Sequence, residues 1–142
     1  MTELEIDKKN VMIAKFLGWF QTEHQGPGSW FKTTDCAIVV AYSSYNNYPH
    51  QDLPFRRDWI WLMQALDKIE ELGYYTEISN TGTHWEDDTK SHHICAIYTD
   101  QHNRFPECVR KFGNSKKEAV WEAVSNFARK YLDKELPEAK KR

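Results

Sequence analysis

The sequence lacks several features that would assign it to a specialised class of protein. It has only three cysteines, Cys36, Cys95 and Cys108, and this odd, widely spaced set favours a reducing compartment over a disulfide framework. No apolar run approaches the roughly 18 residues that a membrane-spanning helix needs. No internal repeat or low-complexity segment divides the chain. These absences argue against a disulfide-rich secreted protein, a membrane protein and a repeat protein.

An excess of charge of one sign is also lacking. The formal net charge is −2 and the pI is near 6.3, whereas a general nucleic-acid binder carries a basic excess. The first ten residues are acidic and polar, unlike a signal peptide. The sequence therefore predicts a cytoplasmic protein without a membrane partner.

The residues that are present suit one globular domain over residues 1–142. Hydrophobic residues make up 40% and charged residues 28%, close to globular averages. The charged ends, about 1–5 and 137–142, are expected to be mobile. Aromatic residues make up 14%, which is rich for a core of this size, so we expect some aromatic side chains at the surface, where they often mark binding sites.

Apolar residues at helical spacing predict three helices. The first is expected from about residue 6 or 10 and ends at Gly18, because glycine adopts the left-handed C′ conformation cheaply. The second follows the N-cap Asp58 and runs to Leu72. The third follows a capping box of Ser115 and Glu118, and its apolar face carries Val120, Ala123, Val124, Phe127 and Tyr131.

Apolar and β-branched runs predict the strands between these helices. They are a short edge strand at Trp30–Lys32, a buried strand at Cys36–Tyr42, and two later strands at Tyr74–Ser79 and His92–Thr99. Residues 101–114 are interpreted as a loop. This order predicts an α+β fold, in which a mostly antiparallel sheet of three to four strands is covered by three helices.

The segment over residues 42–50 is unusually dense in tyrosine and asparagine. Tyrosine offers a flat contact face and a hydroxyl, and asparagine both donates and accepts hydrogen bonds, so the segment resembles a recognition surface. Two nearby tryptophans cannot both lie at the centre of the second helix's apolar stripe. The alternative is that the tyrosines cover a sheet edge and the asparagines hold turns. The candidate binding residues are Tyr45, Asn46, Asn47, Tyr48, His50, Trp59 and Trp61.

A local excess of positive charge precedes and opens the last helix. The free amides and the dipole of a helix start attract anions, so this region is a candidate phosphate site for a nucleotide or nucleic acid. The alternative is a solvated helix cap with ordinary surface lysines. The candidate anion-binding residues are Arg104, Arg110, Lys111, Ser115, Lys116 and Lys117.

Metal-ligating residue types are frequent between residues 84 and 95. Their spacing argues against a metal site, because His92 and His93 are adjacent on a strand and point to opposite faces, and no paired C-x-x-C follows. A nucleophilic Cys95 near His93 is conceivable, although Cys95 is interpreted as a core residue. No catalytic motif such as G-x-S-x-G or a P-loop occurs, so no catalytic residue, metal or cofactor is predicted. The residue types in question are His84, Glu86, Asp87, Asp88, His92, His93 and Cys95.

Four stretches resemble the phage ABA-sandwich family, small uncharacterised proteins of bacteriophages and prophages, including those of Bacteroides-type hosts. They are Ile13–Trp19, Tyr45–Phe55, Asp58–Glu70 and Ser115–Val124. The resemblance implies a helix–sheet–helix layered sandwich and a place in the cytoplasm of a bacterial host cell. It implies no established activity and no catalytic residues.

Three hypotheses of function follow. The preferred one is a phage- or prophage-encoded, non-enzymatic binding protein that acts on a host protein or forms a small homo-oligomer, because the tyrosine-dense segment occurs without a catalytic motif. The second is binding of a nucleotide or nucleic acid through residues 104–117. The third is a metal- or thiol-dependent enzyme that uses His84, His92, His93 or Cys95.

Overall fold

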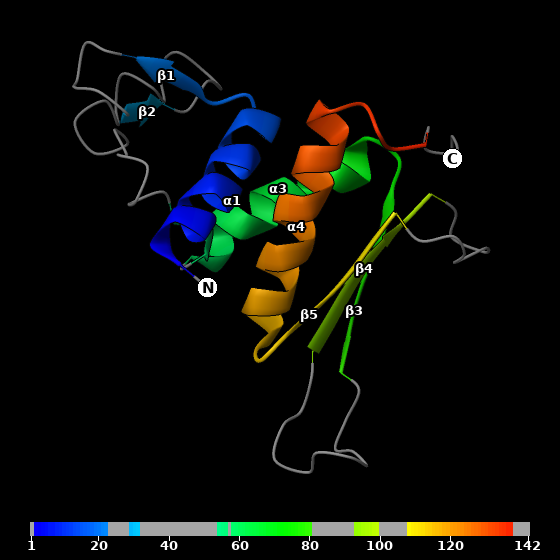
Figure 1. Cartoon of the computed structure of the whole chain (residues 1–142). Helices are drawn as coiled ribbons and strands as arrows, with labels where there is room; N and C mark the ends of the chain where they lie inside the picture. The colour runs from blue at the N-terminus through cyan, green and yellow to red at the C-terminus, as the bar shows by residue number, and fades with distance from the viewer. Residues whose placement is uncertain are drawn as a thin grey trace.

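The computed structural model describes residues 2–22, 29–31, 54–56, 58–80, 93–99 and 108–137. Within them the chain forms three α-helices and a three-stranded antiparallel sheet, which confirms the predicted α+β class (Figure 1). The predicted strand at Cys36–Tyr42 lies outside these residues. The helices are α1 (Glu3–Phe16), α3 (Trp59–Glu71) and α4 (Lys116–Leu132), and a 3₁₀ turn, η2 (Pro54–Arg56), precedes α3.

The three-stranded sheet has the order β3 (Tyr75–Asn80), β4 (His93–Tyr98) and β5 (Val109–Gly113). The prediction of a loop over residues 101–114 was wrong for β5, which pairs antiparallel with β4 from Val109 opposite Ile97 to Gly113 opposite His93. Its short, charged sequence has a weak strand pattern, and pairing with β4 supplies its backbone hydrogen bonds. A separate antiparallel pair joins β1 (Phe20–Thr22) to β2 (Ser29–Phe31), close to the predicted edge strand.

The first helix begins earlier than the apolar pattern predicts. Thr2 and Glu5 form a capping box, in which the Thr2 hydroxyl accepts a hydrogen bond from the Glu5 amide and the Glu5 carboxylate accepts one from the Thr2 amide. This reciprocal cap satisfies two amides that a helix start leaves without partners, so α1 starts at Glu3. The predicted stop is confirmed, since Gly18 has a φ of 82°.

The predicted caps and apolar stripe of α3 are confirmed. The Asp58 carboxylate accepts a hydrogen bond from the Ile60 amide, and Gly73 follows the helix with a φ of 100°. The predicted stripe is buried and comprises Leu62, Ala65, Leu66 and Ile69. Lys68, on the same helix, donates a hydrogen bond to the carbonyl of Phe16, the last residue of α1, and so links the two helices.

The last helix is the centre of the described core. It contacts α1, α3, β4 and β5, and it is accordingly buried around much of its circumference rather than along one stripe. The Ser115 hydroxyl caps it by accepting from the Glu118 amide, while the Glu118 carboxylate accepts from the Asn114 amide. Four of its five predicted apolar positions are fully buried; Tyr131 is 38% exposed, because it lies in the last turn.

The described helices gather on one side of the three-stranded sheet, with α4 against it and α1 beyond α4 (Figure 1). On that side of the sheet, β4 contributes Cys95 and Ile97 to the hydrophobic core, and β5 contributes Val109. In the described part of the chain, no helix is long and apolar enough to span a membrane. This arrangement places one flank of α4 between α1 and β5, where the candidate site lies.

Candidate functional site

The predicted aromatic recognition set is only partly described. Tyr45, Asn46, Asn47, Tyr48 and His50 lie outside the described residues, so their role stays a prediction. The two tryptophans of the set, Trp59 and Trp61, are half-buried and pack against the core. The Trp61 ring lies edge-on to that of Trp19, with 5.6 Å between centroids.

The predicted basic set is not brought together by the fold. Arg104 lies outside the described residues. Arg110 and Lys111 are neighbours on β5 and therefore point to opposite faces of the sheet. Ser115 caps α4, and Lys116 is exposed at its first turn. Of the described members of the set, Lys111 lines the cleft described below.

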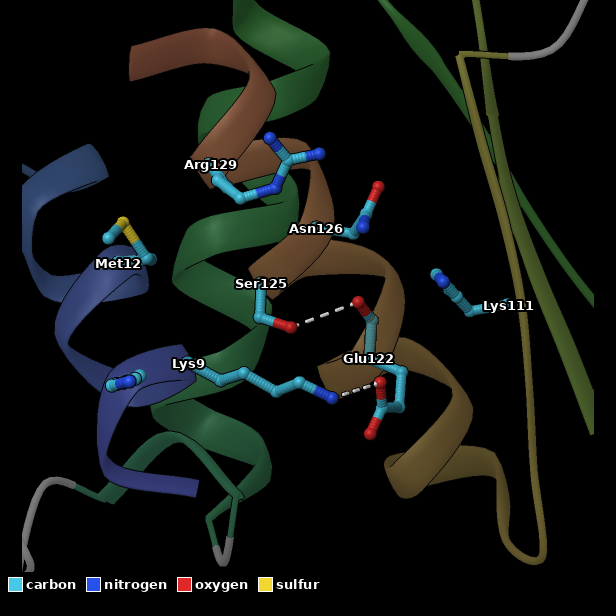
Figure 2. Close-up of a pocket in the computed structure, with 8 residues that line it drawn as sticks. Lys9, Met12, Lys111, Glu122, Ser125, Asn126 and Arg129 are labelled. Atoms are coloured by element: carbon cyan, nitrogen blue, oxygen red, sulfur yellow. Dashed lines mark hydrogen bonds and ion pairs between the residues drawn. The ribbon is translucent and has the colours of Figure 1, made fainter. Parts of the chain in front are cut away.

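A cavity of about 300 Å³ opens between α1, α4 and β5 (Figure 2). We name it the basic cleft, because its described lining has four cationic side chains and one carboxylate. Its volume is at the lower end of the range for small-ligand sites. The lining residues are Lys8, Lys9, Met12, Lys111, Glu122, Ser125, Asn126 and Arg129.

The base of the cleft is an ion pair between α1 and α4. Lys9 Nζ lies 2.6 Å from Glu122 Oε2, and the Glu122 side chain is only 14% exposed (Figure 2). The same ammonium lies 5.3 Å from the centroid of the Trp121 ring. Because the pair is partly desolvated and the ring face is negative, Lys9 is held in place and its charge is largely offset within the protein.

Arg129 is paired outside the cleft, at its upper rim in Figure 2. Its Nη1 lies 3.0 Å from a carboxylate oxygen of Glu135 and 3.4 Å from one of Asp133. All three side chains are exposed, so the pairs contribute little stability and Arg129 can exchange them for a ligand at small cost.

Two ammonium groups and one amide in the cleft are without such partners. Among the described residues, the side chains of Lys8, Lys111 and Asn126 make no hydrogen bond or ion pair. Figure 2 shows Lys111 reaching from β5 toward α4, on the side where Asn126 projects from that helix. Ser125 is buried and donates to the Glu122 carbonyl, 3.0 Å away. The cleft therefore presents unpaired N–H donors from three elements, which is the chemistry that an anion needs.

Sequence reasoning missed most of this site, although a signal was present. On α4, the four polar residues of the cleft recur at helical spacing, at positions 122, 125, 126 and 129, beside the apolar face that we identified. The contribution of Lys8 and Lys9 has no comparable signal, because only the packing of α1 on α4 brings them to the cleft.

A second cavity, of about 450 Å³, lies near the end of α4. Its lining is mostly aromatic and aliphatic, with Lys134 as its single cation. The Tyr74 hydroxyl, which also lines it, donates to the Pro137 carbonyl at 2.7 Å. With few polar groups that converge, this cavity has a weaker chemical signature than the basic cleft.

The groups considered for metal or thiol chemistry do not form a site among the described residues. There, no group of three or more His, Cys, Asp or Glu side chains is placed to hold a metal ion; His84, Glu86, Asp87, Asp88 and His92 lie outside them. Cys95 is fully buried in the core, as interpreted from the sequence, and burial raises the pKa of its thiol to about 12. A thiol with so high a pKa is almost entirely protonated at neutral pH and is a poor nucleophile.

Comparisons with protein-family models, with curated proteins and with solved structures each found no match to this chain. The resemblance to the phage ABA-sandwich family therefore stays a prediction.

Proposed function

We propose that this chain is a non-enzymatic binding protein whose basic cleft receives an anionic partner. The observation that carries the proposal is the gathering of four cationic side chains around one small cavity in a chain whose net charge is −2. Lys8 and Lys111 have no side-chain counter-ion among the described residues, so an anion in the cleft would reduce the repulsion between its cations.

The chemistry of the cleft favours binding over catalysis. General acid–base catalysis needs a group that is free to exchange a proton with the substrate. Glu122, which carries the carboxylate in the described lining, is already engaged by Lys9. The lysines and Asn126 are hydrogen-bond donors suited to holding an anion.

The source of the partner is part of the same proposal. Under the resemblance to the phage ABA-sandwich family, we propose a phage or prophage origin and action in the bacterial cytoplasm. The anionic partner would then be a molecule of the host. Binding of a host protein, or of a second copy, through the tyrosine-dense segment remains the prediction made from the sequence.

Retention at low salt on phosphocellulose, a resin whose phosphate groups are attached singly to the matrix, tests the proposal. Lys111→Glu reverses a charge inside the cleft, and Lys116→Glu makes the same change at the exposed start of α4. Because the two variants have equal net charge, a difference between them reports position alone. We expect Lys111→Glu to elute at clearly lower salt than Lys116→Glu. Equal elution of the two variants would refute the cleft as the binding site.

A further inference from the structure

We infer that the basic cleft is a site for a small phosphate monoester, bound through its phosphate dianion. This inference rests on the proposed anion-binding function and adds the class of the ligand. Three features of the cleft support it: the net charge of its side chains, the short extent of its positively charged surface, which we call the positive patch, and the apolar groups that line one wall.

The charge balance of the cleft matches a divalent anion. Lys9 is offset by Glu122, and Arg129 by Asp133 and Glu135. This leaves two ammonium groups, Lys8 on α1 and Lys111 on β5, on separate elements that border the cavity. A phosphate monoester carries about −1.5 to −2 charges near pH 7, which matches in magnitude the net charge that these two ammonium groups add to the cleft.

The hydrogen-bonding groups also suit a phosphate. Its oxygens are strong acceptors, and lysines commonly bind them as point charges. The side-chain amide of Asn126, which has no partner among the described residues, adds N–H donors on the side of the cleft that Lys111 reaches. Met12 and the methylene stems of the lysines form an apolar wall against which the organic part of a monoester can lie.

The positive patch is too short for a long polyanion. Carboxylates border it, with Glu122 at its base and Asp133 and Glu135 beyond Arg129, and they offset the cations beside them, so a chain of phosphates that left the cleft there would meet no net positive charge. No aromatic ring is among the described residues that line the cleft, whereas sites for single-stranded nucleic acid usually stack bases on such rings. The surroundings therefore favour a single phosphate group over an oligonucleotide.

Binding of a phosphate monoester should depend on pH in a way that binding of other dianions does not. The second proton of a phosphate monoester dissociates near pH 6, so the ligand is a dianion at about pH 7.5 and mostly a monoanion at about pH 5. Sulfate remains a dianion throughout this range and so reports changes in the protein alone. The charged groups that face the ligand are Lys8, Lys9, Lys111, Glu122 and Arg129, and the described part of the lining contains no histidine.

Amide chemical shifts of the isotope-labelled full chain test the inference. Inorganic phosphate, adenosine 5′-monophosphate, sulfate and a single-stranded oligonucleotide of about 12 nucleotides are titrated separately at about pH 7.5 and about pH 5. We expect the monophosphate to shift amides at 8–12, 111 and 122–129, and to bind about tenfold more weakly at the lower pH, while sulfate does not weaken. Lys8→Glu and Lys111→Glu should each abolish these shifts, and Lys116→Glu should retain them.

The outcomes separate the ligand class from the proposed function. Equal loss of sulfate and phosphate affinity at low pH, or preference for the oligonucleotide over the monophosphate, would overturn the phosphate inference but leave an anion-binding cleft. If inorganic phosphate binds at least as tightly as the monophosphate, the ligand is free phosphate and the inference of a monoester is wrong. If no anion shifts the amides of the cleft, and Lys111→Glu also leaves retention on the resin unchanged, both the anion-binding function and the phosphate ligand are refuted.

Discussion

At the residue scale, one buried hydrogen bond ties α1 to α4. Trp121 Nε1 donates a hydrogen bond to Asn10 Oδ1 at 2.8 Å. Both residues are buried, Trp121 fully and Asn10 with an exposed fraction of 2%. The Trp121 ring also lies close to two cations, with Lys9 Nζ at 5.3 Å and the Arg56 guanidinium carbon at 5.4 Å from its centroid. A polar pair inside an apolar core selects one packing of the two helices, because any other packing leaves its groups without partners.

Asn10→Leu is therefore expected to destabilise the protein by about 1–3 kcal/mol, because the indole N–H remains buried without an acceptor. Urea unfolding measures this free energy. Adding Trp121→Phe to the same chain removes the unpaired donor, so the double variant should lose less than the sum of the single variants. Strict additivity would contradict an energetic role for the hydrogen bond.

At the element scale, the contact between β5 and α4 depends on close backbone approach. Gly113 ends β5 and is buried, and a Cβ atom there would lie 2.5 Å from the Ala119 nitrogen and 2.9 Å from the Glu118 carbonyl carbon. Both atoms belong to the backbone of α4, which cannot yield as a flexible side chain would. The absence of a side chain at this position therefore allows the strand to meet the first turns of the helix.

Gly113→Ala should destabilise the protein by on the order of 1–3 kcal/mol, because the added methyl group forces β5 and α4 apart. Asn114→Ala, one residue later on an exposed side chain, is the matched control and should change stability by less than about 0.5 kcal/mol. Thermal or urea unfolding of both variants makes the comparison. If the two variants have the same free energy of unfolding, β5 and α4 can move apart without loss of stability, and the close approach at Gly113 is not required.

At the scale of the whole molecule, the basic cleft exists because α1 packs beside β5 and α4, which follow it about a hundred residues later in the sequence. Residues 8–12 of α1, Lys111 of β5 and one flank of α4 line a common cavity. A ligand that binds this assembled cavity has no equivalent site in the unfolded chain. Binding should therefore stabilise the native state by mass action.

Adenosine 5′-monophosphate at 100 times its Kd should stabilise the folded chain by about 2.7 kcal/mol, which is seen as a rise in Tm. The same concentration should not raise the Tm of Lys111→Glu, whereas Lys116→Glu should respond as the wild type does. A rise in Tm that is identical in all three proteins would assign the effect to general salt or to another site.

Local chemistry allowed most of the described secondary structure to be predicted. Asp58, Ser115, Gly18 and Gly73 act on amides and dihedral angles within a few residues of themselves, so their roles follow from sequence neighbours. The same holds for the apolar stripes of α3 and α4. The strand β5 was missed because its stability comes from pairing with β4, a partner that a local pattern does not specify.

By itself, the sequence determined the class of the fold, the helix ends other than the start of α1, and the burial of Cys95, because capping and apolar periodicity operate over short distances along the chain. The tertiary structure alone decided which cations share a cavity. It separated Arg110 from Lys111 across the sheet and joined Lys111 to Lys8 and Lys9, residues about a hundred positions away. The physical reason is that packing of α1 and β5 against α4 sets the distances between these charges, and those distances determine whether they act on one ligand.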